Sequence, residues 1–186
     1  CNSFLNGLEV AQSLLESGKY KKALIVTGEK PSVSFKEKLK DREDLKNSFA
    51  GYTFGDSGSA VLLEKSNNKN QNSILFQKST TMSKYWNIGT LPGGGTMHPR
   101  GDEFSYFHGG GMALKKAFND LGASFLNNSL HQAGFSYKDF KKIYIHQVSE
   151  SFLMEFIKVT RIPIEKVKIS IKDYGNLAAS TLPIGV

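Results

Sequence analysis

The sequence contains little cysteine and no long apolar run, and each shortage excludes a class of protein. The one cysteine, Cys1, cannot form an internal disulfide, which fits a reducing compartment such as the cytoplasm. No apolar stretch is long enough to span a bilayer, and no basic segment followed by an apolar one indicates a signal peptide. The chain begins without methionine and stops at Val186 inside an expected helix. We therefore expect both ends to be cuts and leave a preceding signal segment open.

Acidic residues are outnumbered, with 24 Lys and Arg against 17 Asp and Glu, giving a formal net charge of +7 over 186 residues. This excess suits nucleic acid, a membrane surface, coenzyme phosphates or an acidic protein, although charge alone favours a lysine-rich solvated surface. Nucleic acid is not expected, because no helix concentrates Arg with aromatic residues and no nucleic-acid motif is present. The 39% hydrophobic content is sufficient for a globular core, in one large domain or two small ones.

The first third of the chain alternates between helix and strand signals. Apolar residues at helical spacing predict a helix over 2–17, with Gly18 as its C-cap and Cys1 at its N-terminal edge. Continuous apolar runs at 23–26 and 60–63 predict strands buried on both faces. Because a short loop joins the helix to the first strand, we expect a parallel α/β layer.

The rest of the chain continues this alternation. A broad apolar face predicts the longest helix over 112–132, ended by Gly134, and an amphipathic pattern predicts a helix over 150–160, stopped by Pro163. The other expected segments are a surface excursion at 30–47, a glycine turn at 54–59 in which Asp56 bonds to backbone N–H groups, a hairpin tip or domain joint at 66–72, a strand at 73–81, a flexible loop at 84–111, and strands at 143–145 and 167–171.

Two polar residues stand where regular elements end. His146 follows the expected strand at 143–145, and Asn176 follows Gly175 just before an Ala-rich stretch that predicts a helix. Because α/β proteins place chemistry at such ends, both are candidate site residues. Each has a plain structural alternative: a satisfied strand-end histidine, and an asparagine that serves a turn or an N-cap.

Cys1 is the third candidate. A thiol at a helix N-terminus lies at the positive end of the helix dipole, and such environments lower a thiol pKa from about 8.5 to about 3.5–7.5, which favours the nucleophilic thiolate. The alternative is an inert, small core residue. His146 could supply a cationic partner for the thiolate or hydrogen-bond a carbonyl oxygen through Nε2, and Asn176 could donate an N–H to the same oxygen.

Other polar and glycine motifs lack the spacing that a bound group requires. No pair of the remaining histidines has zinc-protease spacing, and with one cysteine a structural zinc site is not expected. Neither glycine triplet, at 93–95 or 109–111, follows a strand and precedes Lys with Ser or Thr, so no phosphate-binding loop is expected. The three histidines are His98, His108 and His131.

Four segments, in this order, resemble the β-ketoacyl-acyl-carrier-protein synthase III branch of the thiolase superfamily. They are 1–8, 54–62 with a Gly-Asp-x-Gly-x-Ala motif, 145–147 with His-Gln, and 175–180 with a Gly-Asn motif. The Cys-His-Asn triad of that family maps onto Cys1, His146 and Asn176. The resemblance implies an α/β, thiolase-like fold layered α-β-α-β-α, present here as an incomplete portion of two related halves. Residues 1–72 would be the later part of the N-terminal half, carrying the nucleophile, and 73–186 most of the C-terminal half, carrying His and Asn.

The resemblance also implies an acyltransferase. Cys1 would attack an acyl thioester, malonyl on acyl carrier protein would lose CO2 while His146 and Asn176 stabilise the enolate oxygen, and the carbanion would attack the acyl-cysteine. The product is a β-ketoacyl chain, in fatty acid or related biosynthesis. No cofactor is implied beyond the coenzyme A thioester substrate, and this stretch by itself is expected to be inactive. The implied partners are acyl-CoA, acyl carrier protein and a second copy in a homodimer, with no nucleic acid and no membrane.

The positive charge suits an acidic carrier protein and coenzyme A phosphates. A solvated face remains the alternative for the candidate docking residues, which are Lys138, Lys141, Lys142, Lys158 and Arg161.

Two departures from the family pattern leave alternatives open. Ser3 stands where glycine is usual, and residues 148–151 replace the familiar Ala-Asn and a following basic residue. Val148 resembles a related branch that joins two fatty acyl thioesters by a non-decarboxylative Claisen reaction. A non-catalytic homologue acting as a partner subunit is a further alternative, against which all three triad residues argue.

Overall fold

The structure is a computed structural model that describes residues 1–66, 73–99 and 103–186. Helices and strands alternate in its first third, and helices dominate the rest. In chain order the elements are α1 (Ser3–Glu16), β1 (Lys22–Glu29), α2 (Arg42–Ser48), β2 (Ser57–Glu64), β3 (Gly89–Thr90), β4 (His108–Gly109), α3 (Gly111–Leu121), α4 (Ser124–Gln132), α5 (Glu150–Thr160), α6 (Ile171–Tyr174) and α7 (Thr181–Gly185).

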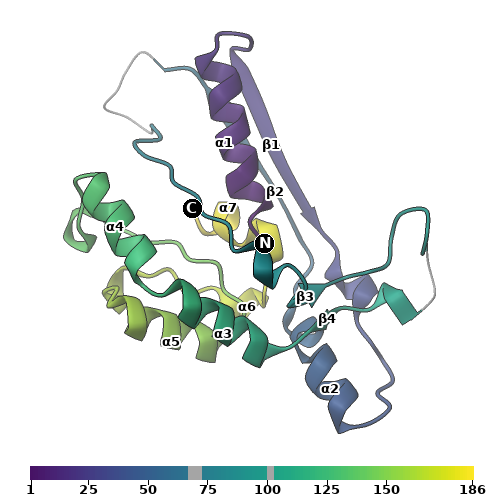
Figure 1. Ribbon diagram of the computed structural model, residues 1–186. Coiled ribbons are helices and arrows are strands. Elements are labelled where there is room, and N and C mark those ends of the chain that lie inside the picture. Colours follow the sequence, from purple (N-terminus) through teal and green to yellow (C-terminus); the bar gives the residue numbers. More distant parts are fainter. Residues whose placement is uncertain (67–72, 100–102) are drawn as a thin grey trace.

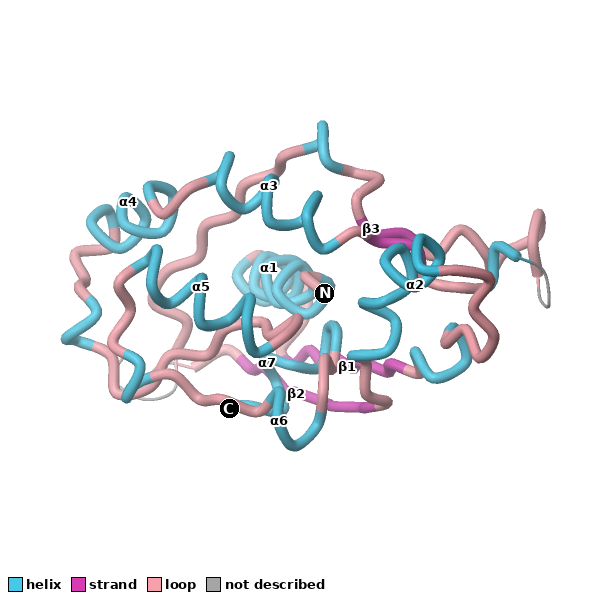
Figure 2. The backbone as a smooth tube through the Cα atoms, turned by 90° about the horizontal axis from the view of Figure 1, so that it is seen from below, coloured by secondary structure: helices cyan, strands magenta, loops and turns pink. Residues whose placement is uncertain are grey.

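Helix α1 organises the molecule. Strands β1 and β2 run alongside it, α7 lies near its N-terminal end, and α3, α4 and α5 form a separate group beyond that end (Figures 1 and 2). Its buried residues are Phe4, Ala11 and Leu15, which share one face at helical spacing. The chain leaves the helix through Gly18, whose φ of +75° is in the left-handed region. The helix predicted over 2–17 is confirmed.

Strands β1 and β2 form an antiparallel pair in which Leu24 lies opposite Leu62 and Val26 opposite Ala60. The two predicted strands are confirmed, but their parallel arrangement and their burial on both faces were wrong. Only one face packs toward α1, while Leu24, Val26 and Leu62 are 59–65% exposed on the other. Antiparallel pairs commonly have one covered and one open face, so an apolar run need not mean double burial.

Segment 30–47 is a surface excursion, as predicted, and it leads into α2, which the Asp41 carboxylate caps by accepting from Asp44 N at 2.8 Å. Asp56 was predicted to bond to backbone N–H groups in its own turn, but its carboxylate accepts from Ser32, from the hydroxyl at 2.6 Å and from the backbone N–H at 2.9 Å. The hydroxyl bond first, and the backbone bond second, hold the pKa of the Asp56 carboxyl below the ordinary value. The predicted flexible loop contains a short ladder, because β3 pairs with β4. The predicted hairpin tip at 66–72 lies outside the described residues except for its first residue.

The single long helix predicted over 112–132 was wrong. Two helices, α3 and α4, stand in its place, and Gly122 between them has φ +66°. A left-handed residue cannot continue an α-helix, so the chain turns there although the apolar pattern runs on. The longest helix among the described residues is therefore α1.

Helix α5 carries the main apolar core and confirms the prediction over 150–160. Ser149 caps it by accepting from Phe152 N at 3.2 Å, and it ends at Arg161, a left-handed residue with φ +58°, two positions before Pro163. Its buried side chains pack with residues of the following loop. The cluster consists of Leu153, Ile157, Ile162 and Val167.

Three predicted strands were wrong. Segments 143–145 and 167–171 meet in one parallel bridge, Ile143 to Val167, and residues 73–81, which the structure describes, run without a ladder. Strand formation needs a partner at the right register, which the local apolar pattern does not supply.

Two glycines let the chain cross itself where α6 ends. Gly55 N donates to Asn176 O at 3.0 Å, and Asn176 N donates to Thr53 O at 2.7 Å. A Cβ on Gly55 would collide with the Tyr174 carbonyl oxygen, and one on Gly175, at φ +72°, would lie 2.7 Å from Thr53 O. The crossing fixes the start of the segment that leads into α7, where the predicted Ala-rich helix is confirmed as a 3-10 turn followed by α7. In the described part of the chain, no helix combines the length and apolarity that a bilayer crossing requires.

Candidate active site

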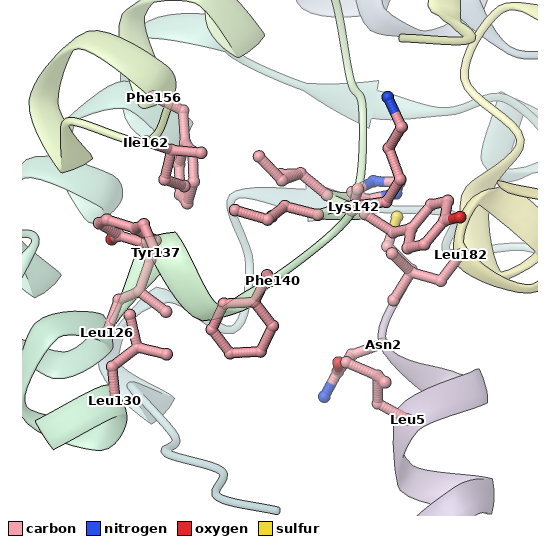
Figure 3. A pocket seen from close by; sticks show the side chains of 15 residues that line it. Asn2, Leu5, Leu126, Leu130, Tyr137, Phe140, Lys142, Phe156, Ile162 and Leu182 are labelled. Atoms are coloured by element: carbon pink, nitrogen blue, oxygen red, sulfur yellow. The ribbon is translucent and has the colours of Figure 1, made fainter. Parts of the chain in front are cut away.

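Cys1 and His146 line the same cavity, which has a volume of about 520 Å³ and walls that are mainly apolar. Side chains of α4, α5 and the chain between them form one wall, and residues of α1 and α7 face them from the opposite side (Figure 3). The structure therefore brings two of the three predicted site residues to one space. The apolar lining residues labelled in Figure 3 are Leu5, Leu126, Leu130, Tyr137, Phe140, Phe156, Ile162 and Leu182.

Cys1 lies just ahead of α1, whose N-cap is Asn2, and it is exposed and unbridged. The Asn2 side chain donates to Asn6 Oδ1 at 3.0 Å, so it does not cap the helix. The first N–H groups of α1 therefore have no side-chain cap within the described residues. This position agrees with the predicted thiol at a helix N-terminus.

The His146 ring is largely removed from solvent. Its Nδ1 lies 3.2 Å from Thr181 Oγ1, and its Nε2 is buried without a hydrogen-bond partner in the described part of the chain. Burial is the largest cause that lowers the pKa of His146 from 6.5 to about 4. The ring is thus neutral near pH 7. Both predicted roles, a cationic partner for the thiolate and hydrogen bonding through Nε2, stay predictions.

Asn176 is 2% exposed, and its position is fixed by its own backbone and side chain. Besides the bonds to Thr53 and Gly55, its Oδ1 accepts from Ala178 N at 3.0 Å. No acceptor contacts its Nδ2 among the described residues, which leaves that N–H₂ free to donate. Asn176 is not part of the cavity lining, so the predicted convergence of all three groups is seen only for Cys1 and His146.

Gln147 holds the chain that carries His146, a role that sequence reasoning missed. Its Nε2 donates to Lys168 O at 2.7 Å, and its Oε1 accepts from Ser170 N at 3.0 Å and Ile171 N at 2.9 Å. A buried amide that makes three bonds to one loop fixes the direction of the neighbouring ring. The His-Gln pair in the motif was its sequence signal.

A chain of hydroxyls, buried at Thr27 and Ser180 and half-buried at Ser59, connects the α7 segment to the sheet. Thr27 Oγ1 lies 2.6 Å from Ser59 Oγ and 2.7 Å from Ser180 Oγ, and the Glu29 carboxylate accepts from Ala179 N at 3.1 Å. These bonds join both strands beside α1 to the segment between Asn176 and Thr181. Nothing in the local sequence pattern indicates such long-range pairing, so it was not predicted.

The predicted docking residues are all exposed, and Lys142 also lines the cavity. Within the ranges that the structure describes, no group of three His, Cys, Asp or Glu side chains could hold a metal ion. The surface of this site is therefore basic beside an apolar interior.

Comparison with known proteins identifies the family. Residues 1–83 match the model described as 3-oxoacyl-[acyl-carrier-protein] synthase III, and residues 130–186 match the C-terminal model of the same family. The β-ketoacyl-[acyl-carrier-protein] synthase III of Acholeplasma laidlawii is 25% identical, with 98% of this chain and 52% of the relative covered. The synthase III 2 of Vibrio vulnificus is 28% identical, with 100% and 49% covered. The chain spans about half the length of the curated relatives that it matches.

Solved structures show the same fold. The Aquifex aeolicus 3-oxoacyl-[acyl-carrier-protein] synthase III superposes with a TM-score of 0.78 at 25% identity, covering 100% of this chain and 54% of that one. OleA of Xanthomonas campestris gives 0.78 at 20% identity, with 97% and 53% covered, and supports the fold alone. The fold class is thus thiolase-like α/β, present in part. The chain belongs to the 3-oxoacyl-[acyl-carrier-protein] synthase III family of thiolase-superfamily condensing enzymes.

Proposed function

We propose that the protein containing this chain catalyses decarboxylative Claisen condensation of an acyl thioester with malonyl-acyl carrier protein, in fatty acid or related biosynthesis. The observation that carries the proposal is the cavity shared by the Cys1 side chain and the His146 ring. Its apolar walls suit an acyl chain, and the names of the relatives agree with this chemistry.

In the first half-reaction, the Cys1 sulfur attacks the thioester carbonyl of acyl-CoA and the coenzyme A thiol leaves. The acyl chain remains on Cys1 as a new thioester, and no net redox change occurs. Covalent catalysis of this kind divides one difficult transfer into two easier steps.

In the second half-reaction, a malonyl thioester loses CO2 and leaves an enolate whose oxygen needs hydrogen-bond donors. Asn176 Nδ2 has no acceptor within the described residues, and His146 can donate when its proton is on Nε2. Donors aimed at developing oxyanion charge stabilise such an intermediate by several kcal/mol, on the order of 3 for one donor. The carbanion then attacks the acyl-cysteine carbonyl, which releases Cys1 and forms the β-ketoacyl product.

The proposed partners are acyl-CoA, an acidic carrier protein that meets the exposed Lys and Arg residues near His146, and a second copy in a homodimer. The open apolar face of β1 and β2, with Leu24, Val26 and Leu62, supports burial against further protein. We also place the protein in the cytoplasm, in keeping with its single unbridged cysteine.

The decisive experiment is intact-mass spectrometry of the complete protein after incubation with acyl-CoA thioesters of several chain lengths. We expect an acyl adduct on wild type and none on Cys1→Ala. Addition of malonyl-acyl carrier protein should then discharge the adduct with release of CO2. Absence of any adduct would favour a non-catalytic subunit, and discharge by a second acyl thioester without CO2 would favour the non-decarboxylative reaction.

A further inference from the structure

The Thr181 hydroxyl is the one described group that contacts the inner nitrogen of the His146 ring. Thr181 is 4% exposed at the start of α7, and its Oγ1 lies 3.2 Å from His146 Nδ1 and 3.0 Å from Ala178 O. A hydroxyl has one proton to donate and can accept as well. A carbonyl oxygen can only accept, so the Thr181 proton satisfies Ala178 O when the ring nitrogen is itself a donor.

Ala178 O also accepts from Thr181 N, so the hydroxyl proton of Thr181 can be directed either to Ala178 O or to an unprotonated Nδ1. When it is directed to Ala178 O, Thr181 Oγ1 accepts the Nδ1–H of His146, and Nε2 carries a lone pair. Nε2 has no partner among the described residues, and the ring lines the cavity that Cys1 also lines. In the acyl-transfer step, this lone pair is the acceptor that we assign to the thiol proton of Cys1.

The two half-reactions need opposite properties at Nε2, a statement that rests on the proposed function. Acyl transfer needs an acceptor for the Cys1 proton, whereas condensation needs a donor to the enolate oxygen. Burial keeps the pKa of His146 at about 4, so the resting ring is not an imidazolium that could act as the donor to the enolate oxygen. A neutral ring can meet both needs only by changing the nitrogen that carries its single proton.

We propose that Thr181 is a positioning residue that lets neutral His146 carry its proton on Nδ1 in the resting enzyme and on Nε2 during condensation. In the second state the hydroxyl rotates and donates to Nδ1 in place of Ala178 O. In either tautomer the buried Nδ1 is then hydrogen-bonded, which avoids the free-energy cost of an unpaired buried polar atom.

The protons balance in each step. During acyl transfer, the Cys1 S–H proton passes to Nε2 as the sulfur–carbon bond forms, and it passes on to the departing coenzyme A sulfur as the old bond breaks. Between the half-reactions, water takes the Nδ1 proton and water supplies one to Nε2, so the net charge is unchanged. No oxidant or other reagent is required.

The test uses the complete protein and three variants. Thr181→Val replaces the hydroxyl by a methyl group of similar size, and Thr181→Ser keeps it. Thr160→Val is the matched control, because Thr160 is 3% exposed and its hydroxyl bonds only within α5, to Phe156 O and Ile157 O. Nitrogen-15 chemical shifts of His146 report the tautomer without substrate, and intact mass reports the rate of acyl-cysteine formation.

We expect the wild-type ring to carry its proton on Nδ1 and the Thr181→Val ring to carry it on Nε2. Thr181→Val should form acyl-cysteine about tenfold more slowly or worse, in line with loss of a proton acceptor. CO2 release by the fully acylated variant should fall less, and Thr181→Ser should restore both rates toward those of Thr160→Val.

A resting wild-type ring with its proton on Nε2 would overturn the inference, and this measurement needs no variant to fold. A Thr181→Val acylation rate within about twofold of Thr160→Val would also overturn it. If the tautomers behave as expected but wild type forms no acyl-cysteine, the assignment of the resting ring stands and the proposed function fails.

Discussion

The two sides of the candidate site differ in how firmly they are held. Cys1 is exposed ahead of α1 and depends on that helix for its place, whereas His146 and Asn176 belong to segments fixed by buried hydrogen bonds. Gln147 holds the first segment, and the crossing with residues 53–55 holds the second. Oxyanion donors act best when they need not rearrange, so the firm placement of His146 and Asn176 suits the roles that we propose for them.

The largest expected effect is on the condensation rate, and it comes from removing the side-chain donor of Asn176, which lies on the firmly held side of the site. Asn176→Ala removes Nδ2 together with the Oδ1 bond to Ala178 N, and Asn176→Asp keeps the acceptor while losing the donor. We expect both to lower the condensation rate of the complete enzyme by about 100- to 1,000-fold, as for loss of an oxyanion donor. Acyl-cysteine formation should fall far less. If Asn176→Asp condenses at the wild-type rate, donation by Asn176 is not part of the reaction.

The next effect is the pH dependence of the folding stability, to which the buried His146 on the firmly held side contributes. Because the pKa of His146 is about 4 in the folded protein and 6.5 is its ordinary value, the unfolded chain binds more protons between these limits. Stability should therefore fall as pH drops from about 6.5 to about 4, by about 3 kcal/mol from this residue.

Urea unfolding at several pH values measures this slope. His146→Asn should show a smaller loss of stability than wild type over the same range. Several carboxyls with lowered pKa values, among them Asp56 and Asp139, lose stabilisation on acidification in both proteins, so the difference between the two curves isolates His146. Parallel curves would contradict the buried, neutral ring.

A smaller effect concerns the crossing that places Asn176. Gly55→Ala puts a methyl group against the Tyr174 carbonyl oxygen, and we expect a loss of about 2 kcal/mol in the free energy of unfolding. Gly28→Ala in β1 is the matched control, since no described atom lies within 4 Å of the added Cβ, and its effect should stay within about 0.5 kcal/mol. Equal losses in the two variants would show that the crossing is not tightly packed.

Sequence patterns predicted elements whose signals are local and missed those that depend on distant partners. The periodicity of α1 and α5 and the glycine at position 18 were sufficient because helix bonds and caps are made within a few residues. Gly122 lies inside a continuing apolar pattern, where a glycine is often tolerated, so the break between α3 and α4 had no clear signal. The expected strand at 73–81 failed because pairing is decided by a neighbour far along the chain.

The site shows the same division. Cys1, His146 and Asn176 were predicted from their places at element ends and from the family motifs, and their catalytic roles remain predictions. Thr181 and Gln147 were not assigned any role, because their partners lie 35 and 21–24 residues away along the chain. A residue that acts through hydrogen bonds to distant segments leaves little signal in the sequence around it.

The buried hydroxyls of Thr27 and Ser180 restrict how these two positions can vary among related proteins. An apolar residue at Thr27 would leave the Ser180 oxygen without its hydroxyl partner, which costs about 1–3 kcal/mol, whereas a joint exchange of both for apolar residues of similar shape can be nearly neutral. Positions 27 and 180, far apart in the sequence, are thus expected to change together, and an isolated change at Thr27 should be rare.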